Sequence, residues 1–104
     1  MELLTRLEEV ILIAVLRLDE QAYGVAINRE VSRMFERDYT LGALYFALDQ
    51  LVRKEYLRKR PGESTARRGG KSKTYYSLTP EGEAALKAVR SHQERIWKTA
   101  PKPI

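Results

Sequence analysis

The amino-acid sequence predicts a mainly α-helical domain with a small β-hairpin. Apolar residues recur at helical spacing over three successive stretches, and the spacing then changes to the alternation of a β-strand. Gly and Pro stand where the pattern changes, as expected at turns and helix ends. At 104 residues, the chain is long enough for one domain with a modest core.

The first two predicted helices cover residues 3–18 and about 23–35. Apolar side chains spaced three or four residues apart define the first, namely Leu3, Leu7, Val10, Ile11, Ala14 and Leu18, with Ile13 and Val15 widening the stripe. Residues 19–21 break this pattern, and a second stripe runs from Tyr23 to Phe35. Residues 36–39 then make a short polar connection to a third helix.

The third predicted helix begins after Thr40, whose hydroxyl can cap free backbone N–H groups, and ends near Lys54. Its expected buried side chains are Leu41, Leu44, Leu48, Leu51 and Val52. Residues 56–60 and the aromatic, alternating residues 74–78 predict two strands joined by a long basic loop. Thr79 as N-cap and Pro80 as first helical residue open a last helix that runs to about Thr99.

Two helices joined by a short turn and followed by a hairpin are the order of a winged helix-turn-helix. We expect residues 1–78 to form this unit, and residues 79–104 to form a C-terminal helix and a short tail. The two parts should make one compact unit.

Composition limits the classes of function. The chain has no cysteine, which excludes a disulfide framework and thiolate metal or nucleophile sites. It lacks an apolar run of the roughly 18 residues that a membrane span needs, and its first residues do not resemble a signal peptide. We therefore expect a cytoplasmic protein with no membrane partner.

The distribution of charge indicates a polyanionic partner. Residues 1–20 carry a net −3, whereas residues 58–73 carry seven Lys and Arg against one Glu, a net +6. Within this segment the cations and glycines of the predicted wing are Arg67, Arg68, Gly69, Gly70, Lys71 and Lys73. Glycine lets a loop approach a phosphate backbone closely, so we expect this wing to bind phosphates. A merely solvated charged loop is the alternative, and the position after a helix-turn-helix argues against it.

The third helix carries the expected reading surface. Opposite its core side lie Gly42, Phe46, Asp49, Gln50 and Arg53, with Ala43 at the margin. The small Gly42 and Ala43 allow close approach to a major groove. Phe46 either contacts a thymine methyl group or packs under a neighbouring loop, while Gln50 could read an adenine edge.

Several motifs in this order resemble the PadR family of transcriptional regulators. They are Leu41-Gly42-Ala43-Leu44-Tyr45, Leu48-Asp49-Gln50-Leu51, Arg68-Gly69-Gly70-Lys71 and residues 75–82, with Ala22-Tyr23-Gly24 at the start of the second helix. The resemblance covers about residues 3–90. It implies a homodimeric bacterial or archaeal regulator, usually a repressor, which binds an inverted repeat in double-stranded DNA through Tyr45 and the wing cations. Tyr23 and Thr40, which open two of the helices, complete the candidate DNA contacts.

The sequence departs from the family pattern at three places. Family members often have proline at the position of Phe46 and arginine at that of Gln50, so the base preference implied by the resemblance does not transfer to these positions. They also often have glycine near Glu55, and the departure there predicts a different end to the third helix.

The last helix predicts a dimer from its own pattern. About 21 residues span roughly 30 Å, and the apolar stripe extends past anything a small hairpin could cover. The family resemblance implies that the first and last helices dimerise, which gives the predicted interface Leu3, Leu4, Leu7, Ile11, Leu86, Val89, Ile96 and Trp97. Trp97 packs across this interface or, like an aromatic residue in some family members, lines a pocket for a small-molecule effector.

No residue pattern predicts catalysis, a metal site or a cofactor. His92 is the only histidine and has no cysteine near it, so the ligands of a typical zinc site are missing. A sequence-specific DNA-binding regulator is therefore the leading hypothesis. A winged-helix module that binds a protein, which would not need the net +6, and a nonspecific nucleic-acid-binding protein, which would not prefer a palindrome, are the alternatives.

Overall fold

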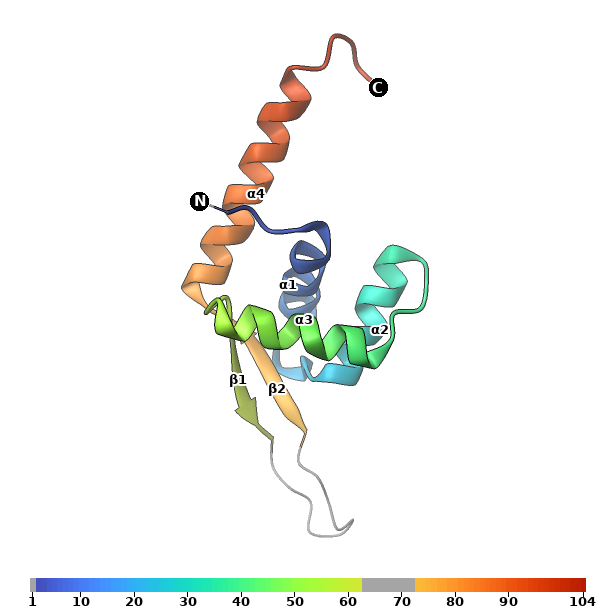
Figure 1. The fold of residues 1–104 in the computed structure, drawn as a ribbon, viewed down its shortest axis with the longest axis vertical. Helices are drawn as coiled ribbons and strands as arrows, with labels where there is room; N and C mark the ends of the chain where they lie inside the picture. Colours follow the sequence, from blue (N-terminus) through green and yellow to red (C-terminus); the bar gives the residue numbers. More distant parts are fainter. Residues whose placement is uncertain (1, 63–72) are drawn as a thin grey trace.

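The computed structural model of the chain describes residues 2–62 and 73–104. These residues form a helical domain with a two-stranded antiparallel sheet at one side and a long last helix that leaves the domain (Figure 1). The elements in order are α1 (Arg6–Leu18), η1 (Asp19–Gln21), α2 (Gly24–Phe35), α3 (Leu41–Arg53), β1 (Leu57–Pro61), β2 (Thr74–Leu78) and α4 (Pro80–Lys98). This is the winged-helix order, and the predicted fold class is confirmed.

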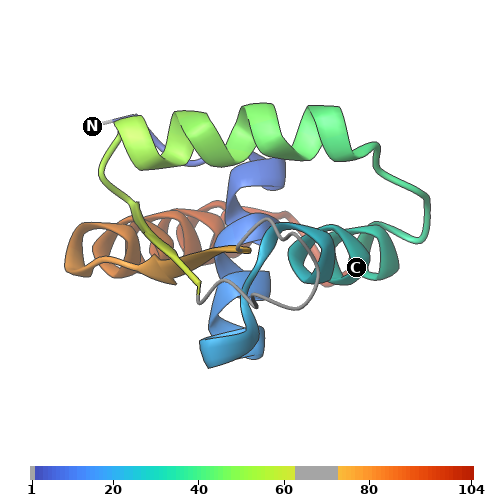
Figure 2. The same ribbon diagram turned by 90° about the horizontal axis from the view of Figure 1, so that it is seen from below.

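The core lies where α1, α2 and α3 meet the hairpin. Seen from below, α3 runs along one side of the domain and α1 crosses it steeply (Figure 2). The fully covered side chains at this crossing include Ile11, Leu12, Ile27, Val31, Leu44, Leu48, Leu51 and Leu57. Burial of each such side chain contributes about 1.5–3 kcal/mol, so this cluster is the main source of the stability of the fold.

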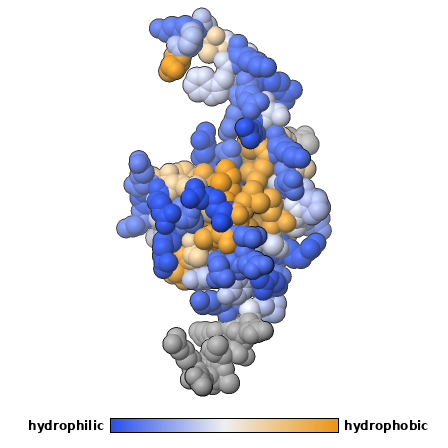
Figure 3. Space-filling view, turned by 180° about the vertical axis from the view of Figure 1, so that it is seen from behind, coloured by the Kyte–Doolittle hydropathy of each residue, from blue (hydrophilic) through white to orange (hydrophobic). Residues whose placement is uncertain are grey.

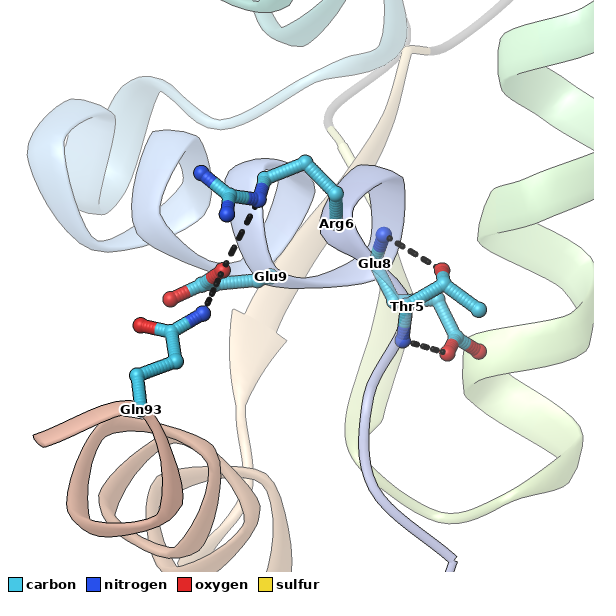
Figure 4. Close-up of polar contacts among 5 residues, drawn as sticks. All are labelled: Thr5, Arg6, Glu8, Glu9 and Gln93. Carbon is cyan, nitrogen blue, oxygen red and sulfur yellow. Dashed lines mark hydrogen bonds and ion pairs between the residues drawn. The ribbon is translucent and has the colours of Figure 1, made fainter. Parts of the chain in front are cut away.

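The first helix begins later than its apolar stripe predicts. Thr5 is its N-cap: the Glu8 backbone N–H donates to Thr5 Oγ1 over 3.1 Å, and the Thr5 N–H donates to Glu8 Oε1 over 2.9 Å (Figure 4). This reciprocal capping box satisfies two backbone donors and fixes the start of α1 at Arg6. Leu3 and Leu4 therefore precede the helix, and the predicted start at residue 3 is wrong.

The end of α3 also differs from expectation. Glu55 has a φ of 64°, the left-handed conformation in which helices commonly end on glycine. The Tyr56 N–H donates to the Leu51 carbonyl and the Glu55 N–H to the Val52 carbonyl, each over 3.0 Å, which makes a Schellman ending. The expectation of a different helix end is thus wrong, because glutamate adopts the conformation that glycine usually supplies.

The hairpin is tied to the helices along β2. β1 and β2 pair in antiparallel register from Leu57 opposite Leu78 to Pro61 opposite Thr74. On the other edge of β2, the Tyr76 N–H donates to the Ala22 carbonyl over 2.8 Å, and Tyr23 forms a bridge pair with Tyr75. The start of α2 therefore acts as a short third strand that fixes the hairpin against the helical part of the domain.

Candidate nucleic-acid interface

The side of α3 that was predicted to contact DNA faces solvent. Thr40 caps the helix, with the Ala43 N–H donating to Thr40 Oγ1 over 3.2 Å, as predicted. Leu44, Leu48 and Leu51 are buried, so the opposite side faces solvent. On that side Gly42, Ala43, Asp49 and Arg53 are exposed, and Gln50 is partly buried.

Phe46 is 56% exposed and Tyr45 is 41% exposed. The alternative that Phe46 packs under a neighbouring loop is therefore not realised among the described residues. Leu41 was expected in the core but is 44% exposed, because it stands at the first turn of α3, where the helix extends beyond the core. The exposed surface of the first two turns is thus apolar and aromatic, with no charged side chain between Leu41 and Leu48.

Tyr45 lies against the start of α2. A Cβ built at Gly24 would overlap the Tyr45 hydroxyl and would lie 2.5 Å from Cζ and 2.7 Å from Cε1 of its ring. The neighbouring Tyr76 is 5% exposed, and burial raises the pKa of its hydroxyl, with the charges of Asp49 and Tyr45 acting in the same direction. Tyr76 is therefore a neutral phenol close to α3.

The end of the hairpin next to its connecting loop carries cations and aromatic rings together. Lys73 Nζ lies 4.1 Å from the centroid of the Tyr23 ring, and the Arg60 guanidinium carbon lies 4.8 Å from that of Tyr75. The two rings meet edge to face with their centroids 5.7 Å apart. Arg58, Lys59, Arg60 and Lys73 are exposed, and Tyr23 is partly buried. The remaining predicted wing residues, Arg67, Arg68, Gly69, Gly70 and Lys71, lie outside the described residues.

The predicted dimer residues divide into three groups. Ile11 is fully buried, and Leu4 and Val89 are 8% and 5% exposed. These three pack in the core of the chain itself and offer no surface to a second copy, so their assignment to the interface is corrected. Leu3, Leu7 and Leu86 are partly buried, whereas Ile96 and Trp97 are 54% and 64% exposed.

Two exposed apolar residues of α1 were not among the predicted interface residues. Ile13 and Leu16 are 36% and 53% exposed. A hydrophobic patch covers the centre of the molecule when it is seen from behind (Figure 3). Helical periodicity had grouped Ile13 with a wide stripe, but spacing alone does not tell which edge of the stripe meets the core of the chain.

The contact between α1 and α4 includes polar side chains. The Gln93 amide donates to Glu9 Oε1 over 3.3 Å, and the same oxygen lies 3.7 Å from Arg6 Nε (Figure 4). Beyond Gln93, the helix continues to Lys98 and leaves the domain (Figure 1). Ile96 and Trp97 therefore continue the apolar stripe of Leu86 and Val89 along α4, beyond the part of the helix that packs against the domain.

The charged contacts within the domain are structural. Glu30 is 7% exposed and lies between Arg17 of α1, at 3.3 Å, and Arg33 of α2, at 2.6 Å.

Across the described residues, no group of His, Asp and Glu side chains is arranged to hold a metal ion. None of the described helices is long and apolar enough to cross a membrane.

Comparison with known proteins agrees with this geometry. The model of the transcriptional regulator PadR-like family matches residues 11–88. A PadR-like transcription factor of Bacteroides fragilis is 28% identical and superposes with a TM-score of 0.72, covering 89% of this chain and 84% of that one. A PadR family transcription regulator of Clostridium difficile is 25% identical, with a TM-score of 0.67 and coverage of 90% and 93%.

A third solved structure is similar over nearly the whole chain. RosR of H. salinarum is 30% identical, with a TM-score of 0.62, and the match covers 96% of this chain and 81% of that one. A search of curated protein sequences finds no significant match.

Proposed function

The chain belongs to the PadR-like family of transcriptional regulators, and on this premise we propose that it binds an inverted repeat in double-stranded DNA as a homodimer and represses transcription. DNA-binding transcriptional regulation follows from the family. The finer statements are our proposal, and repression is the mode of action that the family resemblance implies.

The observation that carries the proposal is the exposed face of α3. Phe46 and part of the Tyr45 ring are exposed to solvent, and the partly buried Gln50 follows one turn later on the same helix. The hairpin, which carries the four exposed cations Arg58, Lys59, Arg60 and Lys73, is fixed beside this helix through Tyr23 and Gly24. Such an arrangement suits a helix in the major groove and a basic wing on the phosphates. We assign base reading to Tyr45, Phe46 and Gln50, close backbone approach to Gly42 and Ala43, and phosphate contacts to Thr40, Arg53 and residues 67–73.

Dimerisation through α4 completes the site. Ile96 and Trp97 are large apolar side chains on the part of α4 that leaves the domain. A second copy related by a two-fold axis would cover them and would set two recognition helices about one DNA turn, roughly 34 Å, apart. We assign Trp97 first to packing across this interface, and the same place makes it the side chain beside which a small-molecule effector would bind.

The test is binding of the full chain to a duplex selected from a random pool, measured by fluorescence anisotropy. We expect a preference of about a thousandfold over random duplex, and an affinity that falls steeply with salt because phosphates are neutralised. Tyr45→Ala or Gln50→Ala should lower the preference about tenfold, since base contacts specify. Arg68→Ala or Lys71→Ala should weaken both duplexes alike.

Lys87→Ala is the matched control, because it removes the same charge from an exposed i,i+4 pair on α4, away from α3 and the hairpin. It should leave both affinities within about twofold. Equal affinity for selected and random duplexes would refute sequence-specific binding. Equal effects of the α3 and wing substitutions on the preference would refute the division of roles.

A further inference from the structure

The start of α2 joins the two elements to which we assign DNA contacts. Its N-cap residue, Tyr23, pairs with Tyr75 of the hairpin, and the preceding Ala22 accepts a hydrogen bond from the Tyr76 N–H. The next residue, Gly24, is buried and faces Tyr45 of the recognition helix. Consecutive residues thus contact the base of the wing and the reading surface.

The Tyr45 ring occupies the space that any side chain at Gly24 would need. The ideal Cβ position at Gly24 lies 2.5 Å from Tyr45 Cζ and 2.7 Å from Cε1, far inside the 3.5–4.0 Å of a favourable carbon contact. At Gly42, by contrast, a Cβ would meet nothing within 4 Å. The Tyr45 ring therefore packs directly against the backbone at the start of α2.

The backbone of Gly24 does not itself require glycine. Gly24 is the first residue of α2 and has no φ in the left-handed region, so alanine can adopt its conformation. Alanine is also the better helix former by about 1 kcal/mol. The three atoms nearest to a methyl group at this position all belong to the Tyr45 side chain.

We infer that Gly24 is a positioning residue for DNA recognition: it seats the Tyr45 ring so that the exposed part of the phenol is held at a fixed place relative to α3 and the hairpin. The inference rests on the proposed function, in which Tyr45 reads DNA. Tyr45 is 41% exposed, so the ring has one side on α2 and an accessible remainder. Preorganising such a side chain lowers the entropy lost when it contacts a base.

A double-mutant cycle on the full chain tests this role. Gly24→Ala, Tyr45→Ala and the double variant are titrated with the selected duplex and with random duplex. Gly24→Ala should weaken binding to the selected duplex about tenfold and to random duplex less than twofold, because only the base-reading contact is displaced. In the Tyr45→Ala background the same methyl group should have no further effect, since the ring it collides with is gone.

Unfolding in urea separates positioning from a general loss of structure. Gly24→Ala should lower the midpoint when Tyr45 is present and leave or raise it when Tyr45 is alanine, because helix propensity then acts alone. The double variant therefore provides a folded protein even where the single variant is unstable. Val25→Ala, at an exposed position next along α2, is the matched control and should bind both duplexes like the parent chain.

The outcomes distinguish failure of the DNA contact assigned to Tyr45 from failure of the positioning role of Gly24. If Tyr45→Ala keeps the preference for the selected duplex, the DNA contact assigned to Tyr45 in the proposed function fails. If Tyr45→Ala loses the preference but Gly24→Ala keeps it, only the positioning role of Gly24 fails. A further loss on adding Gly24→Ala to Tyr45→Ala also overturns the inference, because the glycine would then act independently of the ring.

Discussion

The helices α3 and α4 begin alike and end differently. Each is capped by a threonine, Thr40 or Thr79, whose hydroxyl accepts a backbone N–H three residues later. At its other end, α3 is held by an ion pair between Lys54 and Glu8 of α1. The final turns of α4, beyond Gln93, extend away from the domain, with Ile96 and Trp97 exposed (Figure 1).

This difference separates two kinds of exposed apolar surface. Tyr45 and Phe46 lie on a helix fixed at both ends and beside a basic hairpin, which suits contact with a rigid, charged duplex. Ile96 and Trp97 lie on an arm that continues past its own core, which suits burial against another protein surface. Exposure alone does not distinguish the two cases, whereas the tethering and the surrounding charge do.

The largest expected effect is at the free end of α4. The double substitution Ile96→Asp with Trp97→Asp should raise the dimer dissociation constant at least about a hundredfold, because each interface would lose four large apolar side chains and bury carboxylates. Analytical ultracentrifugation measures the dissociation constant. Binding to an inverted repeat should weaken in parallel, since the two half-sites would no longer be bound together.

Ser91→Asp is the matched control, because it places a carboxylate on the exposed opposite side of α4. It should leave the dissociation constant unchanged. An aspartate pair at 96 and 97 that leaves the dimer intact would show that the end of α4 is not the interface.

A smaller effect distinguishes the role of Phe46. If its ring contacts a thymine methyl group, replacing that thymine by uracil in the selected duplex should weaken binding about fourfold, the value of one buried methyl group of about 0.8 kcal/mol. Phe46→Ala should bind the thymine and the uracil duplex equally, whereas Val25→Ala should still prefer the thymine duplex, as the parent chain does. A parent chain that does not discriminate at any thymine would contradict the methyl contact.

The sequence predicted those features that are set by neighbouring residues. The caps of α3 and α4, the change from helical to alternating spacing and the exposure of Phe46 all follow from local pattern. The capping box at the start of α1 was equally readable, because threonine followed three residues later by glutamate is its signature. It was missed because the apolar stripe of the first helix extends back to Leu3.

Features set by the third dimension were not predictable from spacing. Leu41 fits the stripe of α3, yet it is exposed because the core ends before the first turn of that helix. Ile11 and Ile13 both fit the stripe of α1, but only Ile11 faces the core of the chain. The seat of Tyr45 on Gly24 joins residues 21 positions apart, and a local pattern contains no information about it.

The smallest expected effect concerns the tether at the end of α3. Lys54 Nζ lies 2.6 Å from Glu8 Oε2, with the two side chains 39% and 12% exposed. Partial burial raises the pKa of the Glu8 carboxyl, but the hydrogen bond and charge of Lys54, together with the hydrogen bonds to Thr5, outweigh it and leave that pKa below its ordinary value. The same hydrogen bond to Glu8 raises the pKa of Lys54, so the lysine stays charged at neutral and acidic pH.

A lowered carboxyl pKa stabilises the fold above the pKa of the unfolded chain, and the contribution is lost as pH falls through the folded value. Glu8→Gln should therefore reduce the free energy of unfolding by about 0.5–1 kcal/mol at pH 7, the modest value of a partly screened pair, and the difference should shrink as the pH is lowered to 3. Glutamine can still cap the N-terminus of α1, so the change isolates the charge. Urea unfolding at both pH values measures it.

Glu94→Gln is the control, because it removes the same charge from an ion pair with Arg90 in which both side chains are exposed. Loss of such a pair should change the free energy of unfolding very little. A deficit of Glu8→Gln that persists at pH 3 would mean that the charge of Glu8, and with it the ion pair with Lys54, is not what stabilises this corner. In that case α3 would be held at its C-terminal end by the Schellman turn at Glu55 and its packing, and its difference from α4 would rest on apolar burial alone.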